Sequence, residues 1–239
     1  MYLDNNVLID FEEGIIELEV LTANDDVFYF FSETHIEELL NGLIAHPELE
    51  NTRLHTLELL CGENYIAPDV GPFKGGFEKE TPQRVFELSM QFKRLHDQLY
   101  RYSNAMRISR DAFLNGLHLE KKEVGNYKPS EIFNVLDAKL REHWGYGIDV
   151  YLQKSVATTG RTVFSSLFNL LDFVCYWHDK KNHAARLYDS SHAYFAQYCD
   201  VLVSNDKMMR IKAQAVYSYL GIKTQVCSVD DFLANIVTT

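Results

Sequence analysis

Short apolar segments typical of β-strands lie near both ends of this chain, and a long stretch with helical periodicity separates them. Near the N-terminus, the candidates are residues 2–3 and the continuous apolar run 27–31 (VFYFF). Near the C-terminus, they are the runs at 200–204 and 223–227. Apolar runs without alternation are typical of strands buried on both faces of a parallel sheet, whose strands need crossover connections. This order predicts an α/β fold in which a helical insertion interrupts a short parallel sheet.

Helical periodicity accounts for most of the remaining chain. After a turn at Asn5–Asn6, a first helix is predicted up to about residue 11. Further helices are predicted over the ranges 15–23, 34–45, 52–60, 83–101, 105–116, 130–143, 162–177, 183–198 and 207–220, and from 229 onward. Gly221 is placed to end the helix over 207–220. The segment 67–82 contains three of the five prolines and three of the twelve glycines, which predicts a loop. We therefore expect one domain over 1–239, with the helical insertion at about 67–180.

The composition excludes several classes of protein. Of the 239 residues, 46% are hydrophobic, which is enough for one sizeable core. No apolar run approaches the ~20 residues that a membrane span needs. Residues 2–3 already resemble a strand, and no basic segment precedes them, so we expect no secretory signal. The four cysteines are scattered without a CxxC pair, which predicts reduced thiols in a cytoplasmic protein.

The net charge of −11 is distributed unevenly along the chain. Residues 1–80 contain 18 acidic and three basic residues, whereas residues 81–239 contain 16 acidic and 20 basic ones. An acidic protein repels nucleic acid as a whole, but the second part could present a basic face. Six basic residues over 84–110, with Tyr100 and Tyr102 between them, are a candidate nucleic-acid contact. From composition alone, an ordinary solvated helix surface is the favoured interpretation of this stretch.

Acidic side chains follow the predicted strands. Asp4 comes directly after the first strand, Glu38 lies on the helix after the second, and Asp206 follows the third. Asp189 lies near the predicted start of the helix that leads into the third strand. Because ligands bind beyond the carboxyl ends of parallel strands, we expect these four carboxylates to meet at one edge of the sheet.

Four carboxylates in one pocket cannot all be ionised without a cation, because like charges raise each other's pKa. Hard oxygen ligands without Cys or His favour Mg²⁺ or Mn²⁺, and such a site suits phosphoryl chemistry. Simpler roles remain open at each position. Asp4 and Asp206 could be helix caps, and Glu38 and Asp189 could be solvated helix residues, with Glu37 as the alternative ligand to Glu38.

At these residues the chain resembles the PIN-domain nuclease family. The opening LDNNVLI at 3–9 is similar to the family's hydrophobic-D-T/S-N-x-L-I start, with Asn5 in place of Thr or Ser. The segment at 32–39 is similar to S-x-x-x-x-x-E-L, which places the family's Glu on Glu38. The segments at 189–196 and 203–206 resemble D-x-x-I/H-x-x-x-A and V-T/S-x-D. The resemblance covers about half of the chain, outside the predicted insertion.

The resemblance implies a three-layer α/β/α sandwich and a metal-dependent endoribonuclease that hydrolyses phosphodiester bonds. Mg²⁺ or Mn²⁺ would be bound by the four acids Asp4, Glu38, Asp189 and Asp206, and a metal-activated water would attack in line with the 3′-oxygen as leaving group. The hydrogen-bond donors expected to orient the carboxylates are Asn6, Ser204 and Asn205. The basic residues expected to contact the substrate are Lys207, Arg210 and Lys212.

The family analogy suggests a bacterial toxin or defence effector in the cytoplasm, with RNA as substrate and DNA not excluded. It also allows a protein regulator such as an antitoxin, and a homo-oligomer. The alternative hypothesis is a catalytically silent PIN-like scaffold that binds a protein partner. A dehalogenase-like phosphatase is disfavoured, because Asn6 stands where that family needs an acid. His35 and His192 are interpreted as packed residues in preference to general acids.

Overall fold

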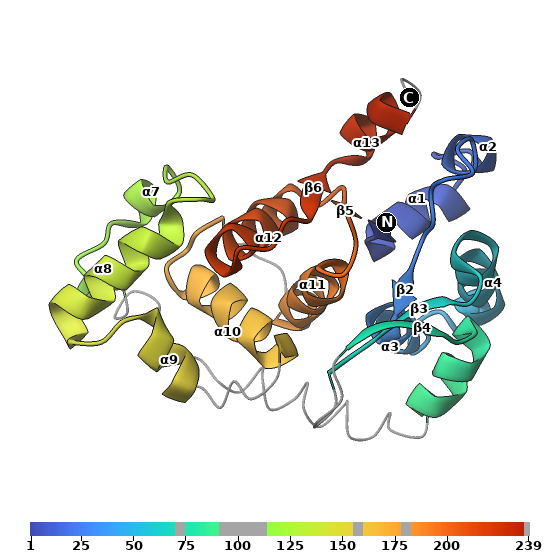
Figure 1. Cartoon of the computed structure of the whole chain (residues 1–239). Helices are drawn as coiled ribbons and strands as arrows, with labels where there is room; N and C mark the ends of the chain where they lie inside the picture. The colour runs from blue at the N-terminus through green and yellow to red at the C-terminus, as the bar shows by residue number, and fades with distance from the viewer. Residues whose placement is uncertain (70–74, 91–113, 155–159, 178–182, 237–239) are drawn as a thin grey trace. The chain divides into compact units, whose positions relative to one another are not determined.

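The computed structural model describes residues 1–69, 75–90, 114–154, 160–177 and 183–236 (Figure 1). These residues form a mixed α/β structure in which helices predominate and the strands make two small sheets, so the predicted α/β class is confirmed. The chain divides into two compact units, each described by itself. Unit one comprises 1–101, 195–207 and 224–239, and unit two comprises 102–194 and 208–223.

Among the described residues, all the strands belong to unit one. Its elements in chain order are β1 (Tyr2–Leu3), α1 (Asn5–Glu12), α2 (Leu18–Leu21), β2 (Phe31–Ser32), α3 (Glu33–Gly42), the 3-10 helix η1 (Pro47–Leu49), α4 (Glu50–Cys61), β3 (Asn64–Ala67), β4 (Gly76–Lys79), a helical segment over 82–90, β5 (Val201–Val203), β6 (Gln225–Cys227) and α13 (Val229–Ile236). The strands at the two ends of the chain therefore belong to the same unit, as the sequence predicted.

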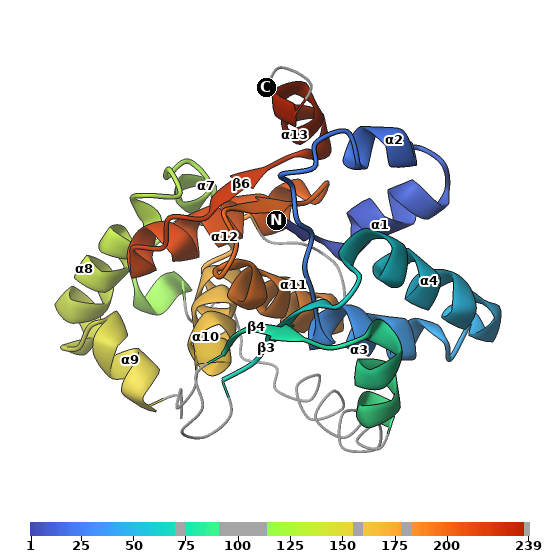
Figure 2. The ribbon, with the colours of Figure 1, turned by 45° about the vertical axis from the view of Figure 1, so that its right-hand side comes forward.

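The strands of unit one form two three-stranded sheets joined at one point. The first sheet is parallel throughout, with the order β1-β5-β6, and the second has the order β2-β3-β4. In the second sheet β2 and β3 are parallel, whereas β3 and β4 are antiparallel and lie side by side in Figure 2. A parallel bridge between Tyr2 and Phe30 connects the two sheets, because it joins β1 to the residue before β2.

The strand order places a topological switch at β1 and β5. From β1 the chain proceeds to β2 on one side, and from β5 it proceeds to β6 on the other side. The helices α1 and α12 begin directly after these two neighbouring strands. In open parallel sheets, this reversal leaves a crevice at the carboxyl ends of the strands where ligands bind. The topology therefore directs attention to Asp4 and Ser204, the residues that follow β1 and β5.

One face of these strands packs on a hydrophobic core. The core includes Leu3 and Phe31 from the strands and Ile36, Leu39 and Leu57 from α3 and α4. The helix α4 packs against α1 (Figure 2). An ion pair of 3.0 Å between Arg53 Nε and Glu12 Oε2 supports that contact, and both side chains are largely buried.

Two segments of unit one differ from the prediction. The predicted loop over 67–82 contains β4, which pairs along its whole length with β3. The sequence of β4 (GFEK) has no apolar run that would predict a strand. The strand is recognised only in the structure, by its pairing with β3. The predicted strand over 27–31 is placed later, with the ladder at Phe31–Ser32 and the bridge at Phe30.

Unit two is helical. Its elements are α7 (Lys121–Val124), α8 (Ile132–Trp144), α9 (Ile148–Lys154), α10 (Gly160–Phe173) and most of α11 (His183–Ala196) and α12 (Lys207–Leu220). The predicted helix over 162–177 ends at Phe173, because Cys175 and Trp177 adopt positive φ angles of 59° and 45°. Most of the segment predicted as a helix over 105–116, and most of the basic stretch over 84–110, lie outside the described residues. None of the helices in the described ranges is both long enough and apolar enough to span a bilayer.

The end of α12 follows the sequence prediction. Gly221 has a φ of +70°, and the N–H of Ile222 donates to the carbonyl of Tyr217 at 2.9 Å. This six-to-one bond with glycine in the left-handed region is the Schellman motif that commonly ends helices.

A buried ion pair joins α10 and α12 within unit two. Lys212 Nζ lies 3.4 Å from Asp172 Oδ1, and the two side chains are 0% and 2% exposed. The ammonium also lies 5.7 Å from the centroid of the Phe168 ring. The prediction that Lys212 contacts a substrate is therefore wrong, because its charge is enclosed and paired with Asp172 inside the unit.

This pair yields a stability prediction. The substitution Lys212→Ala removes the ammonium that is paired with the buried Asp172 carboxylate, so the free energy of unfolding should fall by about 3–5 kcal/mol. Replacing both partners, with Lys212→Met and Asp172→Leu, should cost far less because no charge remains in the core. Urea denaturation followed by circular dichroism measures both, with Lys207→Ala on the exposed start of α12 as control. A Lys212→Ala protein as stable as this control would contradict the prediction.

Candidate functional site

Asp4 lies at the carboxyl end of β1, where the sheet topology predicts a ligand site. Its backbone N–H donates to Val203 O on β5 at 2.9 Å, and Asp4 is only 6% exposed. Asp4 Oδ1 accepts the N–H of Asn5 at 2.7 Å, which caps the start of α1. Asp4 Oδ2 accepts the Ser204 hydroxyl at 2.7 Å and the Asn6 amide at 2.8 Å. Asp4 therefore caps α1, and its carboxylate is also fixed by two side-chain donors.

The residues after β5 complete this network, which we call the Asp4 cluster: Asp4, Asn6, Ser204, Asn205 and Asp206. Ser204 Oγ also accepts the backbone N–H of Asp206, at 3.0 Å. Asn6 Oδ1 accepts the backbone N–H of Asn205 at 3.1 Å. The side chain of Asn205 donates to Asp10 on α1. Residues separated by about 200 positions in the sequence thus form one polar group, and Asn6 and Ser204 make the contacts to Asp4 expected of them.

A second network holds α3 against β1. The backbone N–H of Ser32 donates to His35 Nδ1 at 3.1 Å, so this nitrogen is an acceptor. His35 Nε2 therefore carries the proton and donates to Leu3 O at 2.8 Å. His35 is 2% exposed. It is the packed histidine that the sequence favoured, and it fixes the start of α3 to the strand that leads into Asp4.

The Tyr2 hydroxyl is buried, and its surroundings include the charges of two predicted acids, Asp4 and Glu38. It lies 2.7 Å from Ser32 Oγ inside the protein. Burial raises the pKa of Tyr2 well above its ordinary value, the hydrogen bond with Ser32 opposes this, and the negative charges of Asp4 and Glu38 raise it further. Both carboxylates therefore lie within electrostatic reach of one buried hydroxyl. Glu37 and Glu38 are both half-buried on α3, so the choice between them as the predicted ligand stays open.

The other predicted residues lie as follows. Asp206 directly precedes α12, where Lys207 is exposed and Arg210 is half-buried. Asp189 is half-buried and belongs to unit two, and it lies in the middle of α11 rather than near its start. His192 on the same helix is buried. The structure thus links the backbone of Asp206 to the Ser204 hydroxyl that also bonds Asp4. The meeting of the Glu38, Asp189 and Asp206 carboxylates with Asp4 stays a prediction.

The atoms of the Asp4 cluster that could bind a metal ion are carboxylate, hydroxyl and amide oxygens. Such oxygen ligands suit Mg²⁺ or Mn²⁺. Within the described ranges, however, no three His, Cys, Asp or Glu side chains are grouped as ligands of one metal ion. The predicted four-acid metal site therefore stays a prediction.

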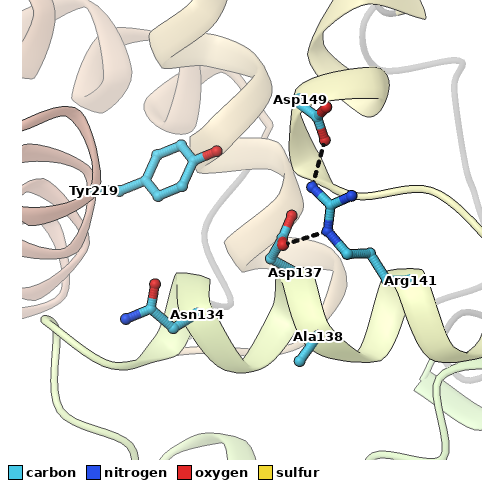
Figure 3. A pocket seen from close by; sticks show the side chains of 6 residues that line it. All are labelled: Asn134, Asp137, Ala138, Arg141, Asp149 and Tyr219. Carbon is cyan, nitrogen blue, oxygen red and sulfur yellow. Dashed lines mark hydrogen bonds and ion pairs between the residues drawn. The ribbon is translucent and has the colours of Figure 1, made fainter.

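Unit two contains a separate polar hollow of about 410 Å³ (Figure 3). Arg141 on α8 pairs through Nε with Asp137 at 2.7 Å and through its terminal nitrogen with Asp149 on α9 at 2.9 Å. Asp137 Oδ1 accepts the N–H of Ile148 at 2.8 Å, and a side chain at Gly147 would overlap this pair. The i, i+4 spacing of Asp137 and Arg141 is the sequence signal that corresponds to this ion pair. These groups satisfy one another and tie α9 to α8.

Comparisons with protein-family models, with curated proteins and with solved structures gave no match to this chain.

The hydroxyl of Ser204 is a test of the Asp4 cluster. Ser204→Ala removes the donor to Asp4 Oδ2 and the acceptor for the Asp206 N–H, and both atoms lie in a largely buried place. We expect a loss of about 1–3 kcal/mol in the free energy of unfolding, because Asp4 Oδ2 and the Asp206 N–H each lose one hydrogen bond in a largely buried place. Chemical denaturation should show no such loss for Ser218→Ala, an exposed serine on α12. Equal stability of the two variants would show that Ser204 does not hold the cluster.

The Asp137 contacts predict a pH dependence. Burial acts to raise the pKa of Asp137, but the hydrogen bonds from Arg141 and the Ile148 N–H outweigh it and lower the pKa. The stabilisation is therefore present above the ordinary aspartate pKa of about 3.9 and is lost as the pH falls through the lowered value. Asp137→Asn should lower the melting temperature at neutral pH, and the difference from wild type should shrink below about pH 4. Glu123→Gln, at an exposed acid of the same unit, should show neither effect.

Proposed function

We propose that the chain is a PIN-like α/β domain that hydrolyses phosphodiester bonds in RNA with Mg²⁺ or Mn²⁺. The observation that carries the proposal is the buried carboxylate of Asp4, which accepts hydrogen bonds from Asn6 and Ser204. It lies at the topological switch between β1 and β5, where the strand order reverses. Two kinds of argument lead to the same place. The resemblance in the four short motifs concerns these residues, and the topology of open parallel sheets favours this edge independently.

The neighbours of Asp4 prepare its carboxylate for a role at a charged ligand. Removing a carboxylate from water is costly, so a protein retains one in a buried place when hydrogen bonds compensate. Here three donors, the N–H of Asn5, the amide of Asn6 and the hydroxyl of Ser204, stabilise the negative charge. They also fix its direction, because they approach both oxygens. Such orientation of a ligand by its own hydrogen bonds is what metal sites require.

The remaining residues have assigned parts in this proposal. Asp4, Glu38, Asp206 and Asp189 would hold the cation, which would neutralise charge on the phosphate and activate a water. Two basic residues at the start of α12, Lys207 and Arg210, would contact the phosphates of the RNA substrate. Lys212 has no part, since it is enclosed in unit two. A toxin or defence effector with a protein regulator, acting in the cytoplasm, is the setting that the family analogy proposes.

The first test is cleavage of end-labelled single-stranded RNA and DNA with Mn²⁺, with Mg²⁺ and with EDTA. We expect metal-dependent products with RNA, and a loss of at least about 100-fold in rate for Asp4→Asn, because charge stabilisation at the reacting phosphate is a large term in catalysis. Asp25→Asn, at an exposed acid of the same unit, is the matched control and should cleave at the wild-type rate.

A measurement of binding separates an inactive enzyme from a protein without a metal site. Mn²⁺ should raise the melting temperature of the wild type and of Asp25→Asn, because a ligand that binds only the folded state stabilises it. Asp4→Asn should lose this shift. A folded wild-type protein with neither cleavage nor a Mn²⁺ shift would overturn the nuclease proposal in favour of the scaffold hypothesis.

A further inference from the structure

Three phenylalanine rings lie on one face of the second sheet in unit one, and we call this group the aromatic face: Phe28, Phe30 and Phe77. Met1 donates its N-terminal amine to Phe28 O, and Phe30 donates its N–H to Met1 O at 3.0 Å. This is the bonding pattern of a parallel ladder, so residues 28–31 are extended and successive side chains alternate between faces. Tyr29 and Phe31 are buried in the core, which leaves Phe28 and Phe30 on the opposite face.

The third ring comes from β4, far along the chain. Phe77 pairs with Ile66 on β3, and Ile66 pairs with Ser32 on β2, so these side chains share the face of Phe30. The rings of Phe30 and Phe77 are 4.5 Å apart between centroids. Phe77 is nevertheless 56% exposed, and Phe28 is 61% exposed. Adjoining exposed aromatic side chains are unfavourable in water, and they are typical of surfaces that bind another molecule.

The edge of the sheet beside the aromatic face is suited to receive an extended segment. In the described part of the chain, β4 is the last strand in the order β2-β3-β4. A strand at the end of a sheet presents backbone N–H and C=O groups to which an added strand can bond. Alternate side chains of such a segment would point to the side that carries Phe77 and Phe30, where apolar residues would cover the rings.

Charge decides what kind of segment fits. Unit one contains 24 acidic and eight basic residues, a net charge of −16, whereas unit two has a net charge of +5. Asp25 and Asp26 are exposed directly before Phe28, and Glu63 and Glu78 are exposed near and on the β3–β4 hairpin. Lys79 on β4 donates to Asn64 Oδ1 at 2.7 Å. This surrounding field attracts cationic groups and repels the phosphates of a nucleic acid.

We propose that the aromatic face and the edge of β4 bind a basic, extended segment of a protein partner, in which apolar and cationic residues alternate. The apolar residues cover Phe28, Phe30 and Phe77, and the cationic residues lie toward the acidic surroundings. The site differs from the Asp4 cluster, so it does not depend on the nuclease proposal.

The probe is a fluorescein-labelled peptide of about ten alternating Lys and Val residues, followed by anisotropy. We expect it to bind the full-length protein and to bind less tightly at higher ionic strength. The double variant Phe28→Ser/Phe77→Ser should weaken binding by about tenfold or more, as loss of buried aromatic anchors does. Ile44→Ser is the matched control, because Ile44 is 67% exposed outside this face, and it should bind like wild type.

Two further arms make the test decisive. Asp25→Asn/Asp26→Asn should also weaken binding of the basic peptide, and this variant leaves the aromatic rings unchanged. A peptide with Glu in place of Lys should not bind. Equal binding by the phenylalanine double variant, shown to be folded by its thermal melt, would overturn the proposal, because charge alone would then account for binding. Binding of a single-stranded oligouridine that is lost in the same variant would overturn it in favour of a nucleic-acid surface.

Discussion

The central strand of unit one is only two residues long, and its polar groups must find partners inside the protein. β1 has β5 on one side and the bridge at Phe30 on the other. Buried backbone groups without partners are costly. Side chains therefore bond to the polar groups that a ladder of two residues does not pair. His35 donates to Leu3 O, Ser32 bonds the Tyr2 hydroxyl, and the Asp4 N–H continues the ladder to Val203. The start of α3, the end of β1 and the end of β5 are fixed together by these bonds.

The position of the candidate site is a consequence of this construction. The same bonds that satisfy β1 bring Asp4 next to Ser204 and set Glu38 one turn of α3 after His35. A polar cluster at the point of strand reversal is where an α/β sheet binds ligands. The acidity of unit one, at net −16, means that an anionic substrate would need cations at this edge. The proposed divalent ion and the basic start of α12 meet that requirement together.

The acidity has a different meaning on the aromatic face. The exposed rings there are uncharged, and the carboxylates around them favour a partner with cationic side chains. One unit thus carries two surfaces with distinct chemistry: a largely buried polar cluster at the strand ends and an exposed apolar face toward β4. Their separation by type of residue allows each to be tested without disturbing the other.

Much of the fold followed from local patterns. The apolar stripe of α3, the glycine that ends α12 and the runs of β5 and β6 predicted elements close to those observed, because burial imposes a period on the side chains. β4 was missed, because GFEK has no such period and forms a strand only against β3. The early end of the predicted 162–177 helix was missed as well, because it depends on positive φ angles at Cys175 and Trp177, residues without a turn signal.

By itself, the sequence determined the α/β class and the placement of strands near the two ends of the chain, since both depend on local residue type and order. It also singled out Asp4 as a candidate site residue. Only the tertiary structure decided which polar residues meet. It joined Asn6 and Ser204 to Asp4 across about 200 positions of sequence. It also removed Lys212 from the candidate site by enclosing it with Asp172. The physical reason is that hydrogen bonds and ion pairs depend on distances of a few ångströms, and folding sets those distances between residues that no local pattern relates.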